Sequence, residues 1–137
     1  MIRVLLADDH PTIRTSVERL VSGVGDMEVV GTARDGEEAV EQATALRPDV
    51  VVVDLAMPRV DGVEATRRIA AAAPEVRVLV LTSYSDRDRI LAALEAGAVG
   101  YLLKDASSEE LIGGIRAAYG GASRVSPQAA AALVWDR

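Results

Sequence analysis

The sequence predicts an α/β fold in which helices cover both faces of an open, doubly wound parallel sheet. Short apolar runs alternate strictly with longer amphipathic stretches, and five such strand–helix units fit the chain. The runs are continuously apolar rather than alternating, which is typical of parallel strands buried on both faces. Parallel neighbours require crossover connections, and we expect these to be right-handed.

Five apolar runs are the predicted strands. Most are rich in β-branched residues or leucine, which favours strands buried within a sheet. The second run is weak, and we expect it at the edge of the sheet. The runs are Ile2–Ala7 (IRVLLA), Glu28–Val30, Val50–Val53 (VVVV), Val76–Leu81 (VRVLVL) and Gly100–Leu103 (GYLL).

The stretches between the runs carry helix signals. Pro11 suits the first position of a helix, and apolar residues between Ile13 and Val24 recur at helical spacing. Gly97 and Gly120 occupy positions expected for C-terminal caps. Four later helices open with a capping-box pattern, an acceptor followed three residues later by an acid. The pairs are Asp35 with Glu38, Asp61 with Glu64, Ser85 with Asp88, and Ser107 with Glu110.

Length and composition restrict the class of protein. A chain of 137 residues, 50% of them hydrophobic, suits one folded domain and argues against disorder. No apolar run approaches the roughly 20 residues that span a bilayer, and no basic and apolar leader precedes the first run. We therefore expect a cytoplasmic protein without a membrane anchor. The lack of cysteine excludes thiolate chemistry, and a net charge of −6 argues against nucleic-acid binding by this domain alone.

Polar side chains follow four of the five predicted strands. Asp8 and Asp9 follow the first strand, Asp54 the third, Thr82 the fourth and Lys104 the fifth. Ligands of open α/β sheets bind outside the carboxyl ends of the strands, so these side chains are expected to share one cleft.

This set of residues points to phosphoryl chemistry with a divalent cation. Two unit charges about 4 Å apart at an effective dielectric near 20 repel by about 4 kcal/mol, and a cation removes that cost. An all-oxygen site favours Mg²⁺, Mn²⁺ or Ca²⁺ over zinc, and Mg²⁺ commonly joins carboxylates to a phosphate. Lys104 supplies a second positive charge and Thr82 a hydroxyl donor, which suits a phosphoryl group bound at Asp54.

The motifs around these residues resemble the receiver domains of two-component response regulators. The matching pieces are LLADDHP, VVVDLAMP, LTSY and AGAVGYLLKDAS, and the resemblance covers about residues 2–120. The first and last of these pieces look most like the NarL/FixJ group, whose receivers usually precede a helix-turn-helix output domain. The resemblance implies a flavodoxin-like (βα)5 fold with strand order 2-1-3-4-5. It also implies a receiver domain over residues 1–120, followed at 121–137 by a linker or a connector helix toward an output domain that this chain lacks.

Carried over residue by residue, the resemblance implies that Asp54 is the phosphoacceptor. Mg²⁺, for which Mn²⁺ can substitute, would be held by Asp8, Asp9, Asp54 and the backbone carbonyl of Ala56. Phosphoryl-binding and switch roles would fall to Thr82, Tyr101 and Lys104.

The function implied is a phosphorylation-dependent switch rather than an enzyme, with at most slow self-dephosphorylation. A histidine kinase would supply the phosphoryl group, and a changed helical face would control self-association or an output. Regulation of transcription would follow through DNA binding by the missing output domain. A homodimer through helical faces is compatible with this scheme, and the sequence does not decide it.

Two residues depart from a common receiver pattern. Asp105 stands where many receivers have proline after the lysine, as in many NarL/FixJ members. Ala56 replaces a longer polar residue, so no side chain there can contact an attacking water, and the lifetime of the phosphorylated state stays open.

Simpler interpretations stand beside these roles. Asp8 could cap the first helix, Thr82 could merely end a strand, and Tyr101 could be a strand tyrosine without a function. His10, the one histidine of the chain, is expected to shape the loop before Pro11, and the role of Trp135 is open.

Three other functions fit the sequence less well than the switch. An aspartate-nucleophile phosphatase would need a second acid two residues after Asp8, where the chain has His10. A flavin carrier would need aromatic residues, which make up 3% of the chain. A receiver that has lost phosphorylation would not need the complete set of acids.

Overall fold

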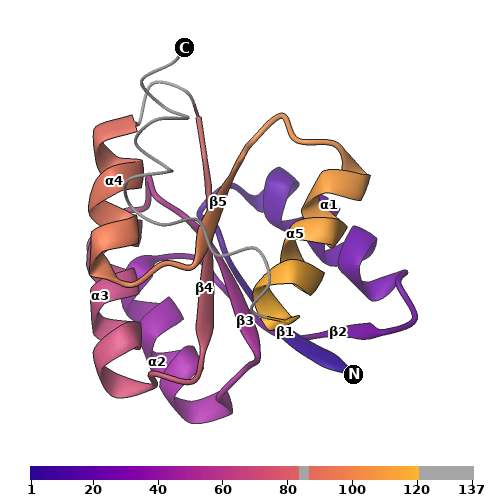
Figure 1. Ribbon diagram of the computed structural model, residues 1–137, viewed down its shortest axis with the longest axis horizontal. Coiled ribbons are helices and arrows are strands. Elements are labelled where there is room, and N and C mark those ends of the chain that lie inside the picture. The colour runs from indigo at the N-terminus through magenta and orange to yellow at the C-terminus, as the bar shows by residue number, and fades with distance from the viewer. Residues whose placement is uncertain (84–86, 121–137) are drawn as a thin grey trace.

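The computed structural model describes residues 1–83 and 87–120, which form five strands and five helices in strict alternation (Figure 1). All strand pairs are parallel, and the order in the sheet is β2-β1-β3-β4-β5. The predicted fold class and strand order are therefore confirmed. The elements are β1 Ile2–Ala7, α1 Pro11–Ser22, β2 Met27–Ala33, α2 Gly36–Leu46, β3 Val50–Asp54, α3 Gly62–Ala72, β4 Arg77–Thr82, α4 Arg87–Ala96, β5 Gly100–Leu103 and α5 Ser108–Gly120.

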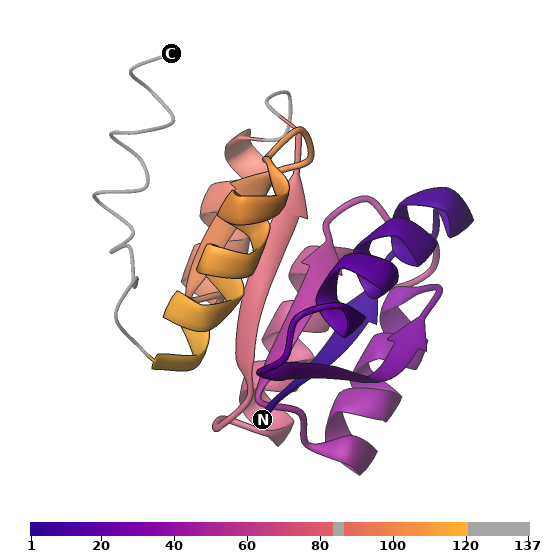
Figure 2. The same cartoon turned by 90° about the vertical axis from the view of Figure 1, so that its right-hand side faces the viewer.

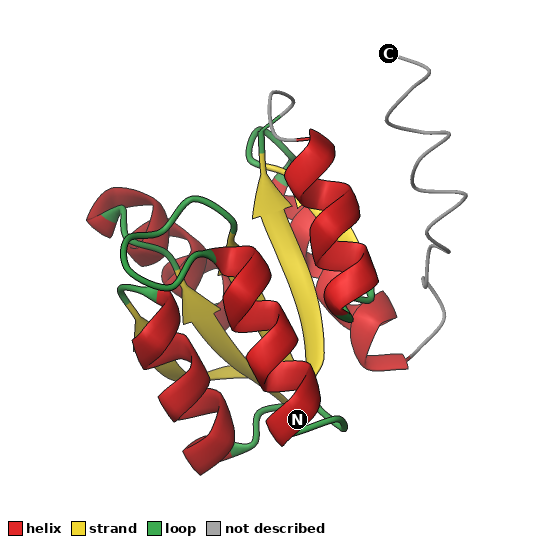
Figure 3. Ribbon diagram, turned by 90° about the vertical axis from the view of Figure 1, so that its left-hand side faces the viewer, coloured by secondary structure: helices red, strands yellow, loops and turns green. Residues whose placement is uncertain are grey.

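Helices cover both faces of the sheet and enclose two apolar cores. Figure 2 shows α1 and α5 on one face, and Figure 3 shows α2, α3 and α4 on the other. Alternate strand residues feed the two cores: Val51 and Val53 contact the side of α2, α3 and α4, whereas Val50 and Val52 contact the side of α1 and α5. This two-sided burial explains why the strand runs are continuously apolar.

Helix starts follow the predicted capping pattern where the structure describes it. The carboxylates of Asp35 and Asp61 accept hydrogen bonds from the backbone N–H groups three residues later. Ser107 and Glu110 form a reciprocal box, in which each side chain accepts from the backbone N–H of the other at 3.1 Å. The predicted pair of Ser85 and Asp88 cannot be compared, because Ser85 lies outside the described residues.

The element boundaries differ from the predictions in a few places. The weak second run is an edge strand, as predicted, but it extends over Met27–Ala33 because pairing with β1 supplies its hydrogen bonds. The register shifts between Val4 and Leu5, so that Val30 has no partner residue in β1. Gly97 follows α4 with a positive φ of 127°, as expected for a cap, whereas Gly120 is the last residue of α5.

The predicted connector at 121–137 lies outside the described residues. Among the helices that the structure does describe, none combines the length and the apolar character needed to cross a bilayer.

Candidate functional site

The site lies at the carboxyl edge of the sheet, where four strands end in polar residues. Asp54 is the last residue of β3 and Thr82 the last of β4, while Asp8 follows β1 and Lys104 follows β5. Only 5% of Asp8 and 2% of Asp54 are exposed, and Thr82 is fully buried. Because the strands are parallel, residues separated by up to 96 positions in the chain meet at this edge.

The predicted acids form a cluster. Asp8, Asp9, His10 and Asp54 each offer one ligand atom, and these atoms all lie within 4.8 Å of one another. Across the described ranges 1–83 and 87–120, two buried side-chain oxygens have no hydrogen-bond partner, Oδ2 of Asp8 and Oδ1 of Asp9. Buried acceptors without donors are costly, and a divalent cation would satisfy both oxygens. The donor set therefore fits a hard cation such as Mg²⁺.

Each oxygen of Asp54 has a partner of its own. The backbone N–H of Ala56 donates to Oδ1 at 3.2 Å, and Nζ of Lys104 donates to Oδ2 at 3.1 Å. Burial raises the pKa of the Asp54 carboxyl, and the charge of Asp8 raises it further, whereas Ala56 and Lys104 lower it. The net direction is upward, so the ionised carboxylate is held in an environment that disfavours its charge.

Thr82 and Tyr101 lie on the same face of the sheet. Val80 pairs with Tyr101 and lies two residues before Thr82, and residues two apart on a strand share a face. Tyr101 is half-buried and packs against the core beneath α2, α3 and α4. The backbone N–H of Lys104 donates to the Thr82 carbonyl at 2.7 Å, which connects the ends of β4 and β5.

Asp8 does not cap α1. The N-cap residue is His10, which makes no side-chain cap, while Oδ1 of Asp8 accepts the His10 backbone N–H at 2.8 Å. The loop therefore folds back on Asp8 and holds its carboxylate toward the cluster. At Ala56 the backbone N–H contacts Asp54. The metal-binding role implied for the Ala56 carbonyl stays a prediction.

Two arginines near the site were not predicted. Nη1 of Arg14 donates to the Asp8 carbonyl at 2.8 Å, and Nη2 of Arg89 donates to the Leu55 carbonyl at 2.9 Å. For Arg14 the sequence holds a signal, because it is a charged residue that shares a helical face with Val17 and Val21. For Arg89 we find no such signal, since its contact depends on how α4 lies against the loop after β3.

The chain matches a known protein family. Residues 4–116 match the family model of the response regulator receiver domain. The chain therefore belongs to the receiver domains of response regulators.

Individual relatives point to one branch of that family. The chain is 42% identical over 130 residues to the transcriptional regulatory protein LiaR of Bacillus subtilis, an alignment that covers 95% of this chain and 62% of LiaR. It is 38% identical over 134 residues to the oxygen regulatory protein NreC of Staphylococcus carnosus, covering 97% of this chain and 62% of NreC. The chain thus spans less than two thirds of the length of these relatives.

Solved structures agree in fold. A two-component response regulator of the LuxR family from Aurantimonas sp. superposes with a TM-score of 0.86 at 36% identity, over 98% of this chain and 96% of that one. The receiver domain of the putative response regulator NarL from Mycobacterium tuberculosis gives a TM-score of 0.84 at 35% identity, over 88% of this chain and 97% of that one. The predicted NarL-type family is therefore confirmed.

Proposed function

We propose that this domain is a phosphorylation-dependent switch of a two-component system, with Asp54 as the phosphoacceptor and a histidine kinase as the donor. The observation that carries the proposal is the setting of the Asp54 carboxylate. It is buried beside two carboxylate oxygens that have no donor among the described residues, and Lys104 lies 3.1 Å from its Oδ2. A nucleophilic carboxylate next to a cation-demanding pocket suits phosphoryl transfer.

The side chains divide the work of transfer. An oxygen of Asp54 attacks the phosphorus atom, and the bond from phosphorus to the donor's leaving nitrogen or oxygen breaks. Asp8, Asp9 and Asp54 with the Ala56 carbonyl would hold Mg²⁺ or Mn²⁺, which neutralises charge on the phosphoryl oxygens when bound. Lys104 offsets the charge of a further oxygen, and the Thr82 hydroxyl donates to the acyl phosphate once it forms.

Phosphorylation then changes a helical face. It replaces the single negative charge of Asp54 with about two on the acyl phosphate and brings three acceptor oxygens, which draws Thr82 toward the phosphoryl group. Tyr101 packs on the same face of the sheet and follows that movement. The surface formed by α4, β5 and α5 is thereby the one we expect to change, with self-association or an output as the result.

The whole protein extends this scheme. Residues 1–120 act as the receiver and 121–137 as a connector to an output domain, since LiaR and NreC are longer than this chain. Regulation of transcription in the cytoplasm follows from DNA binding by that output domain, with dimerisation through helical faces. The receiver itself turns over no substrate beyond slow loss of its own phosphoryl group.

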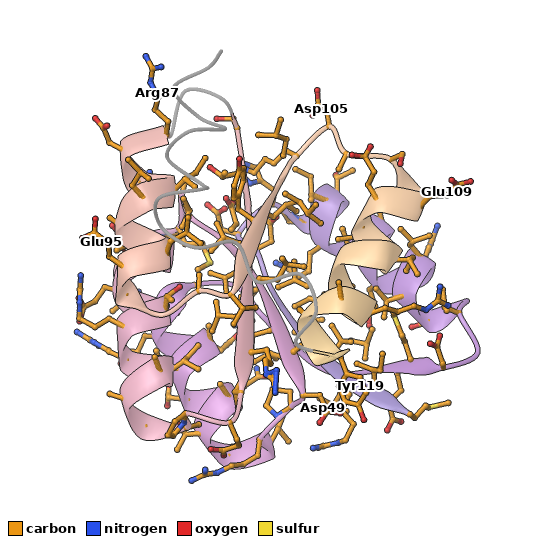
Figure 4. The ribbon with its side chains drawn as sticks, in the orientation of Figure 1. Asp49, Arg87, Glu95, Asp105, Glu109 and Tyr119 are labelled. Carbon is orange, nitrogen blue, oxygen red and sulfur yellow. The ribbon has the colours of Figure 1, made fainter. Side chains whose placement is uncertain are left out.

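Intact mass after incubation with acetyl phosphate and Mg²⁺ tests the proposal. The parent should gain one phosphate that maps to Asp54, and Asp54→Asn should gain none. Asp105→Asn is the matched control, because Asp105 is an exposed acid in the loop that follows β5 and projects outward (Figure 4). Equal labelling of Asp54→Asn and the parent would refute the proposal, as would multiple turnover of a generic phosphate ester.

A further inference from the structure

We propose that His10 is a fourth ligand in this pocket and makes it a mixed nitrogen and oxygen site for a borderline transition metal such as Zn²⁺. The inference shares the divalent-cation pocket of the proposed function and rests on it to that extent. It goes beyond Mg²⁺, because an imidazole nitrogen suits zinc, nickel and copper, whereas carboxylates and carbonyls suit magnesium.

The imidazole lies among the three carboxylates. Nδ1 of His10 is 3.2 Å from Oδ1 of Asp8, 3.1 Å from Oδ1 of Asp9 and 3.8 Å from Oδ2 of Asp54. Adjacent ligands around a tetrahedral zinc with bonds of about 2.0–2.1 Å are separated by about 3.3 Å. The nitrogen is therefore near the distance that shared coordination requires.

Two carboxylate oxygens without donors indicate that a cation belongs there. Oδ2 of Asp8, in a residue that is 5% exposed, has no hydrogen-bond partner among the described residues, and neither does Oδ1 of Asp9. The second oxygen lacks such a bond although Nδ1 is only 3.1 Å away. The ring therefore contacts this oxygen without donating a hydrogen bond to it. An ion between the two atoms would use a lone pair of Nδ1 and a lone pair of Oδ1.

The backbone of His10 is held in place, whereas its side chain has room to rotate. His10 precedes Pro11, which restricts its conformation, and its N–H is bonded to Asp8 at 2.8 Å. The side chains of His10 and Asp9 are 54% and 31% exposed, so both can rotate toward an ion without disturbing the core.

Four protein ligands have a consequence for the switch. Zinc sites with four protein ligands are closed, whereas a site that acts on a substrate keeps one position open. Zn²⁺ held by His10 and three carboxylates would leave no position for a phosphoryl oxygen. We therefore expect Zn²⁺ to compete with Mg²⁺ and to block phosphorylation at Asp54.

The experiment uses the tag-free, ¹⁵N-labelled chain, in which His10 is the one histidine and gives unambiguous imidazole signals. With equimolar Zn²⁺, we expect the Nδ1 signal to move to that of a metal-bound nitrogen while Nε2 keeps its proton. Mg²⁺ alone should not produce this change. Chelator competition should show a loss of Zn²⁺ affinity of at least tenfold in His10→Ala and His10→Gln, with Mg²⁺ affinity changed less than threefold.

Control variants locate the ion. Asp54→Asn keeps the imidazole and removes one carboxylate, so the Zn²⁺-bound signal should weaken. Glu109→Gln removes an exposed acid of α5 and should behave as the parent (Figure 4). An unchanged Nδ1 signal, equal Zn²⁺ affinity of the parent and His10→Ala, or full binding by Asp54→Asn would each overturn the inference.

Phosphorylation measured on the same samples separates the two proposals. Zn²⁺ should inhibit labelling by acetyl phosphate and Mg²⁺ in the parent. In His10→Ala the Zn²⁺ concentration that halves labelling should be at least tenfold higher. If Zn²⁺ moves the Nδ1 signal but Asp54 takes no phosphate from any donor, the proposed function fails and the metal site stands. If Asp54 is labelled but Zn²⁺ leaves the Nδ1 signal unchanged, the metal site fails and the proposed function stands.

Discussion

Nζ of Lys104 lies 3.1 Å from Oδ2 of Asp54, an ion pair in which the carboxylate side chain is 1% exposed and the lysine side chain 27%. The two residues are 50 positions apart: Asp54 ends β3, and Lys104 directly follows β5. Lys104 is also the one lysine of a chain whose other basic residues are arginine or histidine. An ammonium is a compact point charge, whereas a guanidinium is planar and delocalised.

Replacing this lysine should slow phosphorylation. In Lys104→Met the side chain keeps its unbranched shape, one atom shorter, but loses the charge that lowers the pKa of Asp54, so a smaller fraction of Asp54 is ionised at a given pH. The rate of labelling by acetyl phosphate and Mg²⁺ should fall at least tenfold. The acid limb of its pH profile should move to higher pH. An unchanged rate and profile would show that Lys104 takes no part.

The sequence was sufficient to predict which residues meet at the site. Asp54 and Thr82 end strands, Asp8 and Lys104 directly follow strands, and the carboxyl ends of parallel strands lie at one edge whatever the details of the helices. Helix starts could be predicted equally well, because the side chains of Asp35 and Asp61 accept hydrogen bonds from backbone groups only three residues away.

Contacts that depend on side-chain direction could not be predicted from the sequence in this way. The ring of His10 was expected only to shape its loop, yet its nitrogen lies 3.1 Å from Asp9 and 3.2 Å from Asp8. The reach of Arg89 to Leu55 depends on the packing of α4 against another loop, which hydrophobic periodicity does not describe. The length of β2 was underestimated for a related reason, because its later residues are held by pairing with β1 rather than by their own preference.

Removing the Asp54 charge should stabilise the metal-free domain. The folded-state pKa of Asp54 is raised above its ordinary value of 3.8. The corresponding contribution to stability is fully present below the unfolded-state pKa and is lost as the pH rises through the folded-state pKa. Asp54→Asn has no carboxyl that ionises there, so it does not lose this stability as the pH rises. In the presence of a chelator at pH 7, its free energy of unfolding should therefore exceed that of the parent. Urea unfolding at pH 7 and near pH 4 measures this, and the difference should shrink at the lower pH.

Mg²⁺ should stabilise the parent through the acid cluster. A ligand that binds only the folded state at about 100 times its Kd adds about 2.7 kcal/mol to the free energy of unfolding. Asp8→Asn removes one of the clustered ligand groups, so its gain at the same Mg²⁺ concentration should be much smaller. Thermal unfolding with and without EDTA compares the two proteins. Equal gains in both would place the bound ion elsewhere.

Arg89 should hold the loop after β3 in place. Its Nη2 donates to the Leu55 carbonyl at 2.9 Å and lies 3.4 Å from Oδ2 of Asp61, the N-cap of α3. Arg89→Ala should lower the free energy of unfolding by about 1 kcal/mol and speed hydrogen exchange in residues 55–62. Arg68→Ala is the control, since it breaks an exposed pair with Glu64 that contributes little to stability. Equal exchange in both variants would argue against the role of Arg89.

The close approach of α3 to the site requires glycine at position 62. A Cβ added to Gly62 would lie 2.5 Å from the Asp54 carbonyl oxygen and 2.6 Å from Cα of Leu55, both backbone atoms that cannot move aside cheaply. Gly62→Ala should therefore lower the free energy of unfolding by about 1–3 kcal/mol and slow labelling of Asp54. Gly113→Ala provides the contrast, because Gly113 is exposed within α5 and a Cβ there meets no atom of the described chain within 4 Å. That variant should gain about 0.5–1 kcal/mol from its better helix propensity and keep the parent's labelling rate. Urea unfolding and acetyl phosphate labelling of both variants test the contrast, and equal stability of the two would contradict it.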